Sequence, residues 1–261
     1  MPGPMIRPSQ FITTYGEGSI IESRNGPRLI LSVNTGLFAS SLRVHGREIT
    51  VQDYEIIDTR LSKALKSQLE LERPPKFVRI PSNAELGHPD RRAVYRTVAF
   101  PTWSLCTSRG KHRIDADIIY RYKGNVRKAC PECPAELSAN EARKEAGREA
   151  IRFIVACKNG HINDVDWKWQ VCKSRDCNSE YIYWQGGGSL RNINLRCPGC
   201  NRNRKLSDIY MMPHHCTGLL REKDVKEDCD EDAKVIHRGA TYLRFPQLET
   251  SLKIEPNKEI D

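Results

Sequence analysis

The sequence has no hydrophobic run long enough to cross a lipid bilayer. Its uninterrupted apolar segments, such as Leu29–Leu31 and Ile154–Ala156, span only a few residues, whereas a membrane-spanning helix needs about 20. The N-terminal residues Met1–Pro8 also lack the apolar segment behind a basic start that marks a secretory signal. These two absences exclude a transmembrane protein and predict a cytoplasmic one that does not engage membranes.

The signatures of common enzyme families are also missing. The sequence contains no Walker A segment, no nucleophile elbow, no His-Glu-x-x-His motif and no glycine-rich dinucleotide fingerprint. Asp164 and Asp166 lie two residues apart and could form a metal-binding or acid–base pair, but turn and cap roles are commoner for such carboxylates. We therefore predict a non-catalytic protein, with an unrecognised metal-dependent nuclease as an alternative.

Cysteine is absent from residues 1–100 and abundant beyond them. All ten cysteines lie between Cys106 and Cys229. They could form five disulfides, but a cytoplasmic chain keeps its thiols reduced, and clustered cysteines near histidines then indicate zinc. We predict an α+β protein in three parts: a mixed α/β segment over 1–100, a β-rich, zinc-stapled module of zinc-ribbon-like knuckles over 101–240, and a final strand and tail over 241–261.

Local patterns predict the main elements of the chain. Strand-prone residues 19–22 and 28–33 flank a turn and predict a strand pair. Apolar residues between 58 and 71 recur at helical spacing and predict a helix. A capping box at Ser138–Glu141 predicts a surface helix reaching Ala150. Further strands are expected at 93–100, 151–156 and 181–184.

Two Cys-x-x-Cys knuckles carry the strongest metal-binding signal. Cys130-Pro131-Glu132-Cys133 and Cys197-Pro198-Gly199-Cys200 each place two thiolates where they can close on one ion. The ten cysteines and two histidines give twelve ligands, enough for three four-coordinate zinc ions. By chain order we group them as Cys106, His112, Cys130 and Cys133; as Cys172, Cys177, Cys197 and Cys200; and as Cys157, His161, Cys216 and Cys229.

Alternatives to this grouping remain open. The last two groups could exchange half-sites, and His112 could be an ordinary surface histidine. His214 and His215 adjoin Cys216 and are rival ligands. Because four protein ligands leave no position for an activated water, two to three zinc ions bound in this way would be structural rather than catalytic.

Basic residues outnumber acidic ones in the chain. The 42 Lys and Arg against 33 Asp and Glu give a net charge of +9, a balance that favours anionic partners such as nucleic acid. The clearest basic stretch contains no acid and flanks the second knuckle, which would hold its cations at fixed positions suited to phosphates. Its cations are Arg191, Arg196, Arg202, Arg204 and Lys205. The alternative for this stretch is a solvated face.

A second, weaker basic group interleaves cations with aromatic residues, a composition compatible with base stacking. It comprises Tyr120, Arg121, Tyr122, Lys123, Arg127 and Lys128. Trp167, Trp169 and Trp184 are instead predicted to anchor the core around the metal sites. The acidic run Glu222–Asp232 is predicted to be a solvated loop, with neutralisation of the basic stretch as the alternative.

Four segments, in order, resemble the DrmB family of the DISARM phage-defence systems. They are Arg7–Gly16, Phe100–Trp103, Arg152–Asp164, and His237–Thr241 followed by Phe245-Pro246. The resemblance implies a non-catalytic, zinc-binding accessory subunit. It also implies a hetero-oligomer with a DEAD/DEAH-type helicase, DrmA, and a part in recognising foreign DNA.

Two features depart from the family pattern. The first metal site of family members begins with a cysteine pair, whereas Cys106-Thr107-Ser108-Arg109 supplies only one cysteine, so His112 would have to complete that site. Family members also continue for several hundred residues past the point that corresponds to Asp261. The main alternative function is a free-standing zinc-ribbon regulator that binds DNA or RNA alone.

Overall fold

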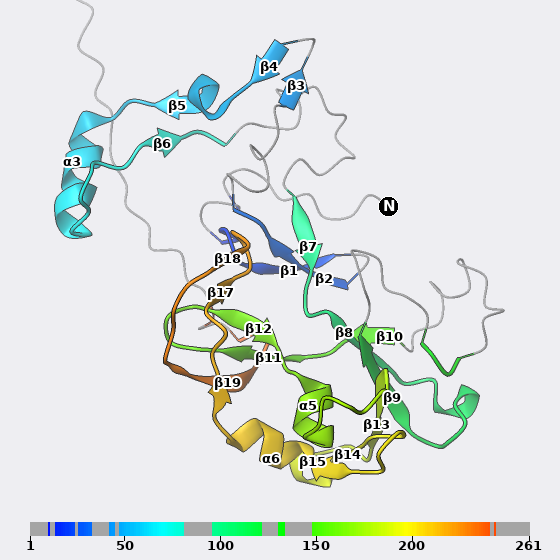
Figure 1. The fold of residues 1–261 in the computed structure, drawn as a ribbon. Coiled ribbons are helices and arrows are strands. Elements are labelled where there is room, and N and C mark those ends of the chain that lie inside the picture. The colour runs from blue at the N-terminus through cyan, green and yellow to red at the C-terminus, as the bar shows by residue number, and fades with distance from the viewer. Residues whose placement is uncertain are drawn as a thin grey trace, which may run out of the picture.

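A computed structural model defines the fold, and strands outnumber helices in it (Figure 1). This confirms the predicted α+β class. No helix in the described part of the chain is both long and apolar enough to span a membrane. The structure describes residues 10, 14–23, 26–32, 42–44, 47–80, 96–121, 130–133, 148–240 and 243.

The N-terminal segment contains a three-stranded antiparallel sheet in the order β1-β2-β7. The strands are β1 (Ile20–Ser23), β2 (Gly26–Ile30) and β7 (Thr97–Ala99). The pairing of β1 with β2 confirms the predicted strand pair. Leu29 of β2 is fully buried and packs in one core cluster with Phe100 and Ile154. This cluster joins the N-terminal sheet to the cysteine-rich module.

A second N-terminal unit projects away from the rest of the molecule (Figure 1). Its helix begins where Asp58 accepts a hydrogen bond from the backbone N–H of Leu61, and it has no buried residue. It confirms the helix predicted between 58 and 71. The elements of this unit are β3 (Leu42–Val44), β4 (Arg47–Ile49), the 3-10 helix η1 (Val51–Tyr54), β5 (Glu55–Ile56), α3 (Thr59–Gln68) and β6 (Phe77–Val78).

The cysteine-rich module is built on a six-stranded antiparallel sheet in the order β10-β8-β9-β13-β14-β15. Two 3-10 helices, η2 (Arg109–Lys111) and η3 (Leu190–Asn192), lie in its connections. β13 confirms the strand predicted at 181–184. The strands are β8 (Trp103–Cys106), β9 (Asp117–Arg121), β10 (Arg148–Ala150), β13 (Tyr181–Gln185), β14 (Asn194–Arg196) and β15 (Asn203–Lys205).

Successive side chains of a strand point to opposite faces of this sheet, and each face contributes to a core cluster. Ile119, Trp184 and Leu195 belong to the main core, which also takes in residues of α5 (Trp167–Cys172) and α6 (Leu206–Met211). The alternate positions Cys106, Ile118, Tyr120 and Tyr183 form a smaller core with Cys130 and Cys133. We call the face with Tyr183 the outer face and the face with Trp184 the inner face.

A four-stranded sheet in the order β12-β11-β19-β16 completes the module. Its central pair, β11 with β19, is antiparallel and buries Ile154 and Val235. A short hairpin, β17 with β18, follows β16 along the chain. The elements are β11 (Phe153–Ala156), β12 (Ile162–Asp164), β16 (His214–His215), β17 (Leu219–Leu220), β18 (Val225–Lys226) and β19 (Asp232–His237).

The predicted surface helix reaching Ala150 is wrong over its described part. Arg148–Ala150 forms strand β10, which pairs with β8 so that Arg148 lies opposite Cys106. The open edge of β8 offers these residues backbone partners, and pairing overrides their weak helical pattern. Residues 138–147 lie outside the described part of the chain. So do 93–95 of the predicted strand at 93–100, and 241–261 apart from Leu243.

The tryptophans divide between the core and the surface. Trp167 and Trp184 are 0% and 7% exposed and meet edge to face, with ring centroids 6.4 Å apart, which confirms both as core anchors. Trp169 is 42% exposed, so its assignment to the core is wrong. Residues two apart on a helix point about 200° away from each other. Once Trp167 faces the core, Trp169 must face outward.

Candidate metal centres

The structure brings the twelve predicted ligands together in three clusters of four, in the groups that chain order indicates. Within each cluster the ligand atoms all lie within 4.8 Å of one another. The first cluster is Cys106, His112, Cys130 and Cys133; the second is Cys172, Cys177, Cys197 and Cys200; the third is Cys157, His161, Cys216 and Cys229. Each cluster can hold a metal ion.

The spacing of the ligand atoms fits zinc and does not fit disulfides. Zinc–sulfur bonds of about 2.3 Å in a regular tetrahedron put the sulfurs about 3.8 Å apart. The Cys106 and Cys133 sulfurs are 3.7 Å apart, and those of Cys177 and Cys197 are 3.4 Å apart. A disulfide needs about 2.05 Å, and all ten cysteines are free. The donor sets, Cys₃His twice and Cys₄ once, are typical of structural zinc sites.

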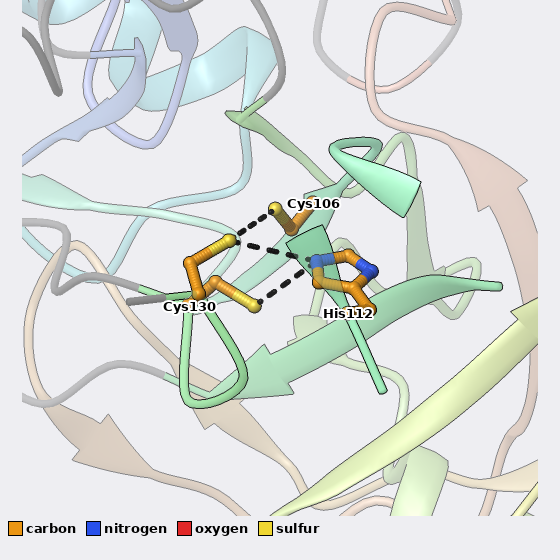
Figure 2. Close-up of side chains that lie close together, drawn as sticks. Cys106, His112 and Cys130 are labelled. Atoms are coloured by element: carbon orange, nitrogen blue, oxygen red, sulfur yellow. Dashed lines mark hydrogen bonds between the residues drawn. The ribbon is translucent and has the colours of Figure 1, made fainter. Parts of the chain in front are cut away.

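In the first cluster, His112 points toward the cysteines (Figure 2). Its Nε2 lies 3.6 Å from the sulfurs of both Cys130 and Cys133. Its Nδ1 lies 2.7 Å from the Ala116 carbonyl oxygen. Because a carbonyl can only accept, Nδ1 must donate its proton, which leaves the Nε2 lone pair directed at the cluster. His112 therefore occupies the fourth corner that the single cysteine at Cys106 leaves open.

Glu132 holds the first knuckle against the outer face of the six-stranded sheet. Its carboxylate accepts hydrogen bonds from the Tyr181 and Tyr183 hydroxyls of β13 and from the backbone N–H of Arg113. Burial raises the pKa of Glu132, but these hydrogen bonds outweigh burial and hold the pKa below its usual value. Burial and the neighbouring carboxylate raise the pKa of Tyr181. The carboxylate is thus ionised and the phenol neutral, as this contact requires.

The second cluster joins the C-terminus of α5 to the hairpin between β14 and β15. The turn of its knuckle closes where the Asn201 N–H donates to the Cys197 carbonyl, and Asn201 has a φ of 56°, in the left-handed region. Burial raises the pKa of the Cys197 thiol, but backbone N–H groups of Cys200 and Gly199 and the neighbouring thiols lower it to about 7. This knuckle stabilises a thiolate, the form that binds metal.

The third cluster ties the turn between β11 and β12 to the segment around the β17–β18 hairpin. His161 Nδ1 lies 3.4 Å from the Cys157 sulfur, and His161 Nε2 lies 3.4 Å from a Glu227 carboxylate oxygen. A carboxylate behind a ligand histidine fixes the ring and strengthens the ligand. The Glu231 backbone N–H and the neighbouring Cys216, His161 and Asn159 groups lower the pKa of Cys229 to about 7.

The two rival histidines lie outside the three clusters. His214 Nε2 is 2.9 Å from the Ile209 carbonyl oxygen, and its Nδ1 is 3.3 Å from the Gln170 amide nitrogen. Both of its ring nitrogens therefore have partners. His215 is exposed on β16. The exchange of half-sites between the second and third clusters is likewise not seen.

Two of the five cations of the predicted basic stretch cap α5, and two lie on the outer face of the sheet. The fifth, Arg191, is exposed on η3. Arg202 donates to the Cys172 carbonyl, and Arg204 donates to the Gln170 carbonyl at 3.2 Å, so both cap the C-terminus of α5. In the register of β14 with β15, Arg204 lies opposite the inward-facing Leu195, whereas Lys205 lies opposite Asn194. Lys205 therefore shares the outer face with Arg196, and both are exposed.

The paired acids Asp164 and Asp166 have structural partners, and the second basic group is only partly described. Asp164 accepts from the Thr102 N–H and hydroxyl and from Arg221, and Asp166 accepts from the Trp169 N–H as the cap of α5. Tyr120 is 3% exposed and Arg121 is exposed. The remaining members of the second basic group, Tyr122, Lys123, Arg127 and Lys128, lie outside the described residues.

The acidic run Glu222–Asp232 is mostly exposed, as predicted. It is not a plain loop, because it contains β18, and Glu222 is only 3% exposed. Among the described residues, Glu231 forms an ion pair with Lys158 at 2.9 Å, and Glu227 forms a hydrogen bond with His161. These contacts place the run beside the third cluster rather than against Arg196 and Lys205.

Comparison with known proteins supports the resemblance drawn from the four motifs. The chain is 27% identical over 221 residues to the DISARM protein DrmB of Bacillus paralicheniformis. The aligned region covers 79% of this chain and 34% of that protein, so the chain spans about a third of its relative's length. It is thus a DrmB-like protein. The sequence model of a family described as a domain of unknown function, DUF8724, matches residues 7–245, and the chain belongs to that family.

Proposed function

We propose that the protein is a non-catalytic, zinc-binding accessory subunit of a DISARM-type antiviral complex in the cytoplasm. In this complex it pairs with a DEAD/DEAH-type, DrmA-like helicase and engages foreign DNA. The observation that carries the proposal is the presence of three complete Cys/His clusters in a chain similar to DISARM DrmB. The helicase would supply the ATPase activity.

A structural role for the metal follows from the ligand count. Each cluster offers four protein ligands, and a four-coordinate zinc with four protein ligands has no position for the water that a catalytic zinc activates. The two acids that the sequence offers as a metal-binding or acid–base pair, Asp164 and Asp166, are engaged by Thr102, Arg221 and the cap of α5. The described site therefore favours a rigid scaffold over a metal-dependent nuclease.

Association with the helicase is the direct test. Co-expression with the DEAD/DEAH helicase of the same defence system should yield a complex that survives size-exclusion chromatography. That complex should bind DNA more tightly than the helicase alone. Tight DNA binding by the isolated protein at physiological salt would instead support a free-standing regulator. Metal-dependent cleavage of DNA by the pure protein would support the nuclease.

Arg196 and Lys205 are the two cations of the basic stretch that we expect to contact phosphates, because both are exposed on the outer face. Replacing both with alanine should leave the zinc content unchanged and weaken DNA binding by the complex. The slope of log affinity against log salt should fall by roughly 0.7 per lost contact on a single strand and roughly 0.9 on a duplex.

The matched control replaces Lys226 and Lys234, two exposed lysines on other strands, and should leave the salt slope as it is. Arg204→Ala serves as a second comparison. It should lower thermal stability, because Arg204 caps α5. An unchanged affinity and slope for the Arg196/Lys205 variant would exclude this surface from the DNA path.

A further inference from the structure

Trp169 stands on the surface of the module with one face of its ring near a lysine. It is 42% exposed, whereas Trp103, Trp167 and Trp184 are all at most 7% exposed. The Lys173 ammonium lies 5.7 Å from its ring centroid and donates a hydrogen bond to Gln170. Among the described residues no aromatic ring packs against Trp169. An exposed indole of this kind offers a ring face on which another aromatic group can stack.

A groove of about 750 Å³ lies beside this tryptophan. Trp169 and Lys168 of α5, Arg175 just after α5, His215 of β16 and Asn163 of β12 line it. The volume falls within the range of about 300–1,000 Å³ that is usual for ligand clefts. The groove therefore combines one aromatic platform with a wall of polar and cationic side chains.

The charge of the groove favours an anion. Lys168 and Arg175 line the groove and Lys173 lies at the tryptophan ring. Of the two acids in the lining, Asp164 is paired with Arg221, whereas Asp166 accepts from the N–H of Trp169 and keeps its negative charge. Lys168, Lys173 and Arg175 thus outnumber the one remaining carboxylate, Asp166, which interacts with Lys173. The balance of charge at the indole is positive, and these cations can meet phosphates.

We propose that the groove at Trp169 binds single-stranded nucleic acid, with one base stacked on the indole and the flanking phosphates held by Lys168, Lys173 and Arg175. This inference rests on the proposed function, because a helicase complex exposes single strands. Duplex DNA fits less well, since its bases are already stacked on each other and cannot reach an exposed ring. Stacking on an aromatic ring tolerates any base sequence, which suits recognition of foreign DNA of arbitrary sequence.

Trp169→Ala provides the central test in the zinc-loaded protein. The probe is a short oligothymidylate, measured by fluorescence anisotropy. Loss of one stacking contact should raise the dissociation constant roughly 5- to 150-fold. The salt slope should stay unchanged, because the ring releases no counterion. Trp169→Phe should recover most of the affinity, since phenylalanine also offers a stacking face.

Controls separate the groove from general surface effects. Met211, on α6, is 80% exposed and lies outside the groove lining, so Met211→Ala should bind oligothymidylate as the unmodified protein does. Lys168→Ala and Arg175→Ala should each lower the salt slope by roughly 0.7. Photo-cross-linking with an oligothymidylate that carries one 5-iodouracil should place the adduct on the peptide that contains Trp169.

Two results would overturn the inference. One is wild-type affinity of Trp169→Ala for oligothymidylate, together with an adduct that maps away from α5. The other is loss of helicase association in Trp169→Ala with oligothymidylate binding intact, which would identify the groove as a protein-binding surface. Zinc content and helicase association of the unmodified protein test the proposed function separately, so either hypothesis can fail alone.

Discussion

A strong chelator should remove about three zinc ions per chain and abolish the cooperative unfolding transition of the cysteine-rich module. The strands of this module are two to six residues long, and each cluster joins segments that lie far apart in the sequence. A structural zinc contributes about 10–16 kcal/mol to folding. A whole domain is stable by only about 5–15 kcal/mol. Loss of a single ion is therefore enough to unfold the module.

Elemental analysis of the purified protein gives the zinc stoichiometry, and circular dichroism during heating follows the fold. Re-addition of zinc to the chelated protein, kept reduced, should restore the transition and so distinguishes metal loss from damage. Fewer than two zinc ions per chain would contradict the metal assignment. Five intact disulfides by mass spectrometry would also contradict it. We expect none, because the sulfurs of Cys106 and Cys133 lie 3.7 Å apart in the structure.

The ligand groups could be inferred from the sequence because their order along the chain is simple. In each cluster a first pair of ligands meets a later pair, and two of the later pairs are Cys-x-x-Cys knuckles. The groups that support the ligands could not be inferred. Glu132 reaches Tyr181 and Tyr183 some fifty residues away, and Glu227 reaches His161 across the third cluster. No local spacing encodes such contacts.

The fold was predictable where local patterns and packing agree. The strand pair of β1 with β2 and the helix α3 follow turn signals and apolar spacing. Trp169 was misplaced because α5 has only six residues, too few to show a helical period. Without that helix, nothing indicates that Trp167 and Trp169 face opposite ways. Strand β10 was missed because its partner β8 lies about forty residues earlier in the chain.

The two cysteines of the second knuckle should differ sharply in their tolerance of replacement. Cys197 is 0% exposed and packs within the main core, whereas Cys200 is exposed. Serine is a poor zinc ligand, so either change weakens the second cluster. At the exposed Cys200 corner, water could replace the lost thiolate as the fourth ligand of a bound zinc ion. At the Cys197 corner no water can enter, and a hydroxyl is left buried in an apolar core.

We therefore expect Cys197→Ser to lose the second zinc ion and to destabilise the protein by more than about 4 kcal/mol. Cys200→Ser should keep a folded chain with weaker zinc affinity. Thermal unfolding and zinc titration of the two variants give the comparison, and their shared knuckle makes each the control for the other. Cys106, also 0% exposed and in a complete cluster with His112, should behave like Cys197. Equal stability of Cys197→Ser and Cys200→Ser would mean that burial does not decide the effect.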